Sequence, residues 1–163
     1  MSRILIIGAC GQIGSELTYE LRRIHGSTNV IASDINHNNL EVVNSGPFEI
    51  IDAKDFNTIK QCVIDHEVDT IYLMAAMLSA TGEKYPEKAW ELNTNSLFHV
   101  LSLAKDKVIK KVFWPSSIAV FGPTTPKENT PQYTIMEPTT VYGITKQVGE
   151  RWCEYYNKNY GVD

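Results

Sequence analysis

A glycine-rich segment near the start of the chain constrains the fold more than any other feature of the sequence. It reads RILIIGACGQIG from Arg3 to Gly14, an apolar run followed by Gly8, Gly11 and Gly14. A buried parallel strand has no polar face, so the uninterrupted apolar run predicts such a strand. Residues 15–23 then place apolar side chains at helical spacing. A glycine turn that opens a helix presents unpaired N–H groups and a partial positive charge to phosphates. The GxxGxxG spacing is not the commonest phosphate-binding pattern, and a plain strand-to-helix turn is the alternative.

The rest of the chain continues this alternation of strands and helices. Further strands are expected at 29–34, 48–52, 70–74 and 111–114, and helices at 55–66, 86–107 and from about 140 to 160. Residues 35–46 read as a loop with a partial helical turn, and the proline-rich stretch 122–138 as an ordered loop. Such alternation predicts one α/β domain over residues 1–163, a Rossmann-type doubly wound parallel sheet.

Composition and charge exclude several classes of partner. The formal net charge of −4, without a basic tail or stripe, argues against nucleic acid and anionic membranes. No apolar run is long enough to span a bilayer. The first expected strand begins almost at Met1, which leaves no room for a targeting peptide. The three cysteines form no CxxC pair and indicate reduced thiols, as in the cytoplasm. The four histidines lack metal-ligand spacing, so no metal is expected.

Two aspartates stand where ligands bind in sheets of this kind, beyond the carboxyl ends of the strands. Asp34 closes the second expected strand about twenty residues after Gly14. A carboxylate there can accept hydrogen bonds from both hydroxyls of an adenosine ribose, and it repels a 2′-phosphate, so NAD is favoured over NADP. The alternative for Asp34 is a capping or turn role. Asp52 closes the third strand and could accept from the adenine amino group, although a helix N-cap role explains it nearly as well.

A second group of polar residues lies near the start of the last expected helix. Tyr142 and Lys146 are four residues apart and therefore share a helix face. A free tyrosine, with a pKa near ~10, is a poor base at neutral pH, but a neighbouring cation favours the phenolate. Ser116 and Ser117 end the fifth expected strand, where a hydroxyl could hold a substrate oxygen.

Together these motifs resemble the extended short-chain dehydrogenase/reductase family. GACGQIG is similar to its glycine loop, WPSSIAVFG to its serine-bearing strand end, and YGITK to its Tyr-Lys motif. The separation between Ser117 and Tyr142 resembles that of the family, which implies Ser117, Tyr142 and Lys146 as the catalytic residues. The resemblance also implies a set of NAD-contacting residues: Gly8, Gly11, Gln12, Ile13, Gly14, Asp34, Asp52, Ala53, Leu73, Met74, Ala75, Ala76, Asn93, Tyr142 and Lys146.

The segments MAAMLSATGEK and SSIAVFGPTTPKENTPQ resemble family members that oxidise L-threonine with NAD, which implies 2-amino-3-ketobutyrate as the product. Tyr142 would then remove the hydroxyl proton of the substrate, Ser117 would hydrogen-bond its oxygen, and Ser79 would contact it or cap its own loop. Phe121 departs from the tyrosine usual in nucleotide-sugar members of the family, which counts against a sugar-nucleotide substrate. A nucleotide-sugar epimerase or dehydratase and a non-catalytic NAD-binding sensor remain the alternatives.

Two expectations concern the assembly. Apolar residues on the helices at 86–107 and 140–160 exceed one core-facing stripe, and the family resemblance implies that these helices pair in a homodimer. The last helix has no following strand, although the alternation of elements demands one. A substrate domain is therefore expected beyond residue 163, and the chain alone is expected to lack dehydrogenase activity.

Overall fold

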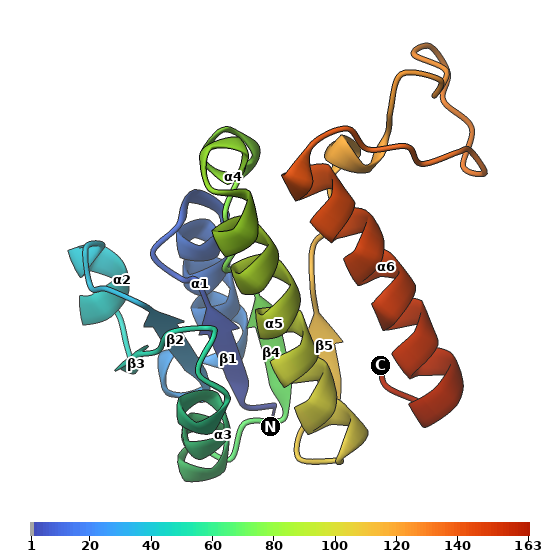
Figure 1. Cartoon of the computed structure of the whole chain (residues 1–163). Coiled ribbons are helices and arrows are strands. Elements are labelled where there is room, and N and C mark those ends of the chain that lie inside the picture. The colour runs from blue at the N-terminus through green and yellow to red at the C-terminus, as the bar shows by residue number, and fades with distance from the viewer. Residues whose placement is uncertain (1) are drawn as a thin grey trace.

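The computed structural model describes residues 2–163 and contains a five-stranded sheet in the order β3-β2-β1-β4-β5. The strands are β1 (Ile4–Ile7), β2 (Val30–Asp34), β3 (Phe48–Ile50), β4 (Thr70–Leu73) and β5 (Lys111–Phe113). Every pair is parallel, with Ile4 of β1 opposite Val30 of β2 and Thr70 of β4. The predicted doubly wound parallel sheet is confirmed (Figure 1).

Helices connect the strands on both faces of the sheet. They are α1 (Gln12–His25), α2 (Leu40–Asn44), α3 (Phe56–Asp65), α4 (Ser79–Lys84), α5 (Pro86–Lys105) and α6 (Val141–Tyr160), with short 3₁₀ turns η1 (Ser27–Asn29) and η2 (Ile118–Val120). The separate helix α4 was not expected. Its N-cap residue, Leu78, makes no side-chain capping bond, so the sequence carries no start signal for it.

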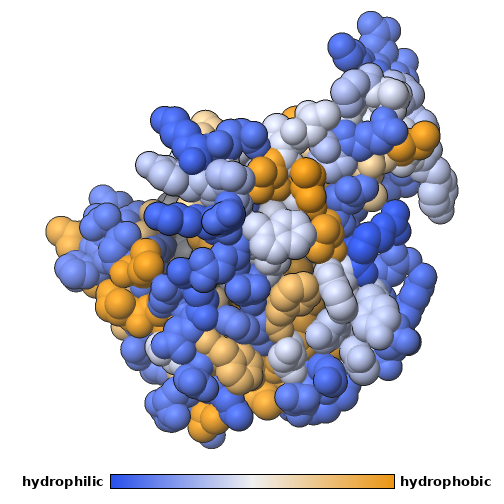
Figure 2. Space-filling model, viewed as in Figure 1, coloured by the Kyte–Doolittle hydropathy of each residue, from blue (hydrophilic) through white to orange (hydrophobic). Residues whose placement is uncertain are grey.

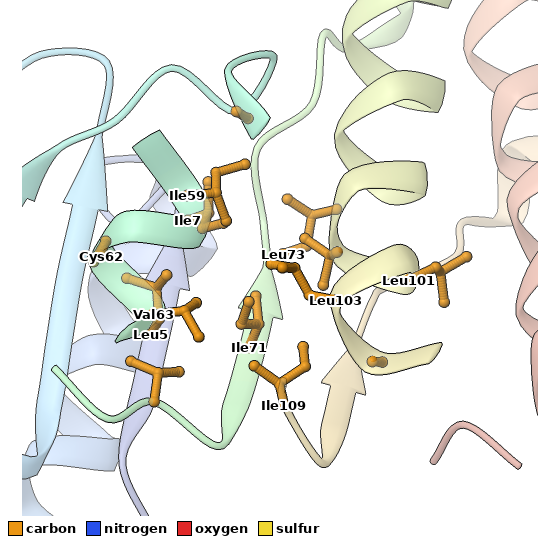
Figure 3. Close-up of a cluster of buried hydrophobic side chains, with 14 of the residues drawn as sticks. Leu5, Ile7, Ile59, Cys62, Val63, Ile71, Leu73, Leu101, Leu103 and Ile109 are labelled. Carbon is orange, nitrogen blue, oxygen red and sulfur yellow. The ribbon is translucent and has the colours of Figure 1, made fainter. Parts of the chain in front are cut away.

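Alternate residues of β1 serve two hydrophobic cores. Leu5 and Ile7 belong to the larger core, which β1, β2 and β4 share with α3 and α5 (Figure 3). Ile4 and Ile6 belong to the smaller core on the opposite face, beneath α1 and α2. This is the period of two expected of a strand, and burial on both faces explains why β1 carries no polar residue.

The two ends of α6 follow from specific residues. Thr140 is the N-cap and its Oγ1 accepts from the Gly143 N–H at 3.0 Å, while Gly161 ends the helix in the left-handed conformation with φ of 65°. Before α6, the proline-rich loop extends away from the sheet (Figure 1), and the buried Thr125 anchors it by donating to the Ile135 carbonyl at 3.0 Å. Among the described helices, none combines the length and the apolar character needed to cross a membrane.

Candidate cofactor site and active site

A cavity of about 240 Å³ opens at the carboxyl ends of the central strands, where parallel sheets of this kind bind ligands. It lies between the glycine turn, the end of β2 and the segments that follow β3 and β4. Its lining residues are Ile7, Gly8, Gly11, Asp34, Ile35, Ile51, Asp52, Ala53, Met74, Ala75, Ala76 and Leu92.

Close backbone packing requires the glycines on either side of the turn. Gly8 has φ of 93°, and a Cβ there would lie 2.5 Å from the Ala75 nitrogen. A Cβ on Gly14 would lie 2.1 Å from the Gly8 carbonyl oxygen. By contrast, a Cβ on Gly11 would meet only the Gly8 oxygen, at 3.5 Å, so the protein alone does not require glycine there. The space left beside Gly11, next to the unpaired N–H groups that begin α1, fits a pyrophosphate.

The Asp34 carboxylate is fixed at the rim of this turn. One oxygen accepts from the Cys10 N–H at 3.0 Å and the other from the Ile35 N–H at 2.8 Å. Because a carboxylate oxygen can accept more than one hydrogen bond, Asp34 keeps acceptor capacity for a ribose diol. The carboxylate thus joins two segments of the cavity wall and caps no helix.

Asp52 lies in the same wall but does not have the N-cap role considered from the sequence. Its Oδ1 accepts from the Lys54 N–H at 2.9 Å, and Asp55 is the residue that caps α3. Ala53, which follows Asp52, is held by His99 of α5, whose Nδ1 lies 3.3 Å from the Ala53 oxygen. This segment is therefore positioned independently of any ligand.

Lys146 and Tyr142 share one face of α6, as their spacing predicted. The Lys146 ammonium is buried, and its Nζ donates to the Pro115 carbonyl at 2.7 Å. The same nitrogen lies 5.6 Å from the centre of the Tyr142 ring and 4.2 Å from that of Trp114. Burial lowers the pKa of Lys146 to about 8, so its charge is less firmly held than that of an exposed lysine.

Ser117 lies beside the first turn of α6. Its Oγ accepts from the Ala119 N–H at 3.2 Å and caps η2, which leaves the hydroxyl proton able to donate. A Cβ on Gly143 would lie 2.2 Å from the Ala119 oxygen, so η2 packs directly against the residue after Tyr142. Ser116, in contrast, donates to Glu150. The two serines thus have different hydrogen-bond partners, and the catalytic role of Ser117 stays a prediction.

Several residues expected to contact NAD lie outside the cavity wall. The Leu73 side chain is buried in the larger core (Figure 3), and the expected contact of Leu73 with NAD stays a prediction. Asn93 is also buried: its amide accepts from the Met77 N–H at 2.8 Å and donates to Thr145 at 3.1 Å. Its amide therefore joins the segment after β4 to α6. Gln12 and Ile13 are exposed in the first turn of α1, and Ser79 begins α4 without capping it.

Four apolar residues of the cavity were not predicted as site residues. Ile7, Ile35, Ile51 and Leu92 line it together with the polar groups. The only sequence signal for the first three is their place at or beside a strand end, where a side chain can belong to the core or to the cavity. Leu92 comes from α5 and carries no such signal.

Comparison with known proteins agrees with this geometry. Residues 4–163 match the NAD dependent epimerase/dehydratase family. An uncharacterized epimerase/dehydratase of Staphylococcus aureus is 48% identical over 100% of this chain and 51% of its own length. The chain thus spans about half the length of the curated relatives it matches.

Solved structures that are similar to this chain carry the names of particular enzymes. A GalE-like L-threonine dehydrogenase from Cupriavidus necator in its holo form has 52% identity and a TM-score of 0.93, over 99% of this chain and 52% of that one. The L-threonine dehydrogenase from Clostridium difficile has 48% identity and a TM-score of 0.96, over 100% of this chain and 51% of that one. The UDP-glucose 4-epimerase from Thermotoga maritima is 25% identical, with a TM-score of 0.87, over 98% of this chain and 52% of that one.

Fold, glycine turn and strand-end carboxylate together define a dinucleotide-binding domain of the Rossmann type. The chain belongs to the NAD dependent epimerase/dehydratase family, which is the extended short-chain dehydrogenase/reductase family expected from its motifs. Its cofactor is NAD, as the sequence predicted.

Proposed function

We propose that the protein containing this chain is an NAD-dependent dehydrogenase that oxidises the secondary alcohol of L-threonine to 2-amino-3-ketobutyrate. The observation that carries this proposal is the buried Lys146 ammonium, 5.6 Å from the ring centre of Tyr142, on a helix packed against the Ser117 turn. A cavity that only bound NAD would not need a buried cation beside a phenol, so a non-catalytic sensor is disfavoured.

Each residue has a defined task in this proposal. NAD, when bound, would supply the acceptor for the hydride that leaves the substrate carbon. Asp34 holds the adenosine ribose, the first turn of α1 receives the pyrophosphate, and Asp52 and Ala53 face the adenine. Tyr142 takes the proton from the substrate hydroxyl, Ser117 donates a hydrogen bond to that oxygen, and Lys146 stabilises the phenolate and binds the nicotinamide ribose. Asn93 is a positioning residue, because its amide is already bonded to Met77 and Thr145.

The choice of threonine rests on similarity and on one position in the chain. Two solved structures that are 52% and 48% identical to this chain over the aligned residues are named L-threonine dehydrogenases, whereas the named UDP-glucose 4-epimerase is 25% identical. Phe121, the residue after η2, supports the same choice, because it lacks the phenol typical of nucleotide-sugar members. Epimerisation or dehydration of a nucleotide sugar is the second candidate, favoured by the fold that this chain shares with the epimerase.

A substrate panel separates these candidates. The complete natural protein, incubated with NAD, is expected to form NADH from L-threonine and to leave UDP-glucose and UDP-galactose unchanged. Conversion of either UDP-sugar, without NADH formation from threonine, would overturn the proposal in favour of the epimerase. Tight NAD binding without conversion of any of these substrates would support the sensor instead.

We propose further that a substrate domain follows residue 163 and completes the site. The described sheet ends at β5, and the Val112 N–H on this edge donates to the Asp163 carbonyl at 2.9 Å. A groove of about 400 Å³ runs along this edge, where another strand has room to pair. Without such a domain, water has access to the reacting atoms, so the 163-residue chain is expected to bind NAD but not to oxidise threonine. Robust turnover by this chain would contradict that expectation.

We also propose a cytoplasmic homodimer formed through α5 and α6. Apolar side chains gather where these helices lie side by side (Figure 2), and the exposed ones include Trp90, Ile144, Trp152 and Tyr155. Pairing with a second copy would cover this surface by a two-fold arrangement of the same helices. The three cysteines are free thiols in the structure, which fits a reducing compartment.

A further inference from the structure

The buried Lys146 ammonium has an unusual set of neighbours, and Trp114 is the nearest of its aromatic ones. Within residues 2–163, the ammonium donates a hydrogen bond to a neutral acceptor, the Pro115 carbonyl at 2.7 Å. The Trp114 ring centre lies 4.2 Å from Nζ, well within the range of a cation–π interaction. A buried cation without a carboxylate depends on such contacts to remain charged.

The position of the Trp114 ring is itself fixed by a second residue of α6. A Cβ on Gly149 would lie 2.3 Å from the ring carbon Cη2 and 2.5 Å from Cζ2. Gly149 is helical and buried, so its own backbone does not require glycine; the indole does. Trp114 is thus inserted between Gly149 and Lys146, less than one turn apart on the same helix.

The remaining titratable groups around Lys146 do not replace this contact. Glu150 of α6 accepts from Ser116, and Cys153 of α6 has its thiol pKa raised to about 11 by burial. Tyr142, the third, presents its ring 5.6 Å from Nζ. The segment after β5 contributes only Trp114 and the Pro115 carbonyl, neither of which titrates. The indole face and the Pro115 carbonyl are therefore the two local groups that stabilise the Lys146 charge.

We propose that Trp114 is a positioning residue that acts through Lys146, holding the ammonium where it meets the nicotinamide ribose and Tyr142, with Gly149 making room for the indole. This inference rests on the proposed function for the role of Lys146, but not on the identity of the substrate. Trp114 lies outside the wall of the NAD cavity and would influence the reaction only through Lys146.

NAD binding by the complete protein, measured by calorimetry from about pH 7.5 to 10, tests this inference, because NAD has no group that titrates in that range. The wild type is expected to bind more weakly as pH rises through the pKa of Lys146, and Lys146→Met should abolish that dependence. Trp114→Leu should move the dependence to lower pH by roughly 0.5 to 1 and weaken binding at the lowest pH by about threefold to tenfold.

Three further variants make the result specific. Trp114→Phe keeps an aromatic face and should recover part of the loss. Gly149→Ala should displace the indole from Lys146 and so cause the same shift in pH dependence and the same loss of NAD affinity as Trp114→Leu. Phe113→Leu, one residue earlier, removes a ring that packs on Tyr72 at 5.1 Å and should bind NAD as the wild type does.

Wild-type affinity and an unshifted pH dependence in both Trp114→Leu and Gly149→Ala would overturn the inference. An equal loss in Phe113→Leu would also overturn it, since the effect would then be general destabilisation. Failure of threonine oxidation in an otherwise NAD-binding protein would refute the proposed substrate and leave this inference intact.

Discussion

Lys146 is the residue at which stability and function conflict. The residue is 3% exposed, and its ammonium contacts one carbonyl and two aromatic rings. Because burial lowers its pKa to about 8, the folded protein releases this proton more readily than the unfolded chain, in which lysine has a pKa of 10.5. Between these two values the unfolded state binds more protons, so stability increases as pH rises.

A pH-dependent stability measurement tests this sign. Relative to Lys146→Met, the wild type should gain about 3 kcal/mol in free energy of unfolding between about pH 7.5 and 11, and most of the gain should fall above pH 8. Denaturant unfolding across this range measures it. Lys60→Met, which removes an exposed lysine of α3, serves as control and should show no such gain. If the free energy of unfolding of the wild type instead fell relative to that of Lys146→Met as pH rises, the lowered pKa of the buried Lys146 would be contradicted.

Asp34 is the single residue that we expect to determine the preference for NAD over NADP. The protein should use NAD with a higher kcat/KM than NADP, because the fixed carboxylate repels a 2′-phosphate. Asp34→Ala removes a charged acceptor and should weaken NAD binding by about tenfold or more, with a smaller effect on NADP. Asp52→Ala, in the same cavity wall, is expected to weaken both cofactors alike. Equal kcat/KM values for NAD and NADP in the wild type would contradict the proposal that Asp34 binds the adenosine ribose.

The first turn of α6 connects the elements of the proposed active site. Thr140 caps the helix, Glu83 of α4 accepts from the Val141 N–H at 2.8 Å, and Thr145 joins Asn93 of α5 to the Tyr142 carbonyl. Tyr142 therefore sits in a turn held by its own N-cap and by two other helices, α4 and α5. Any change in that turn should alter the position of the phenol.

Two N-cap variants separate stability from this positioning. Thr140→Ala and Asp55→Ala, the latter at the N-cap of α3, should each reduce the free energy of unfolding by about 1 kcal/mol. Only Thr140→Ala should also lower kcat, because only that cap orients the turn that carries Tyr142. Matched unfolding curves and initial rates measure both effects. An equal loss of kcat in the two variants would contradict a special role for the α6 cap.

Sequence patterns predicted elements well where burial is uniform and poorly where contacts are distant. The strands around Ile4–Ile7 and Val30–Asp34 were found from apolar runs, and Gly161 correctly marked the end of α6. Arg22 could not be found in this way: it reads as a surface residue of α1, yet it is buried and donates to the carbonyls of Val30, Val42 and Pro47. The Trp114–Gly149 contact likewise joins residues whose proximity only the folded chain creates.

At the scale of the whole molecule, the aromatic surface of α5 and α6 is the feature that supports the proposed dimer. Trp152 packs edge-on against Phe98 at 5.1 Å and against Tyr155 at 5.4 Å, and all three lie along this outer surface. An aromatic group of this size is more typical of an interface than of a solvated helix face.

Light scattering at micromolar concentration tests the dimer. The complete protein should have twice the mass of one chain, and Trp152→Glu should shift it toward the monomer by placing a charge in the interface. Tyr133→Glu, in the 95% exposed position of the proline-rich loop, should leave the mass unchanged. A monomeric wild type would rule out this assembly.

The central claim, that Tyr142 is the base of an NAD-dependent threonine dehydrogenase, is tested most directly by one comparison. NADH formation from L-threonine is measured for the complete wild-type protein and for Tyr142→Phe, together with NAD binding by both. The account predicts that Tyr142→Phe lowers kcat by about 10²–10⁴-fold while NAD affinity stays close to that of the wild type. Turnover by Tyr142→Phe at a rate near that of the wild type would contradict it.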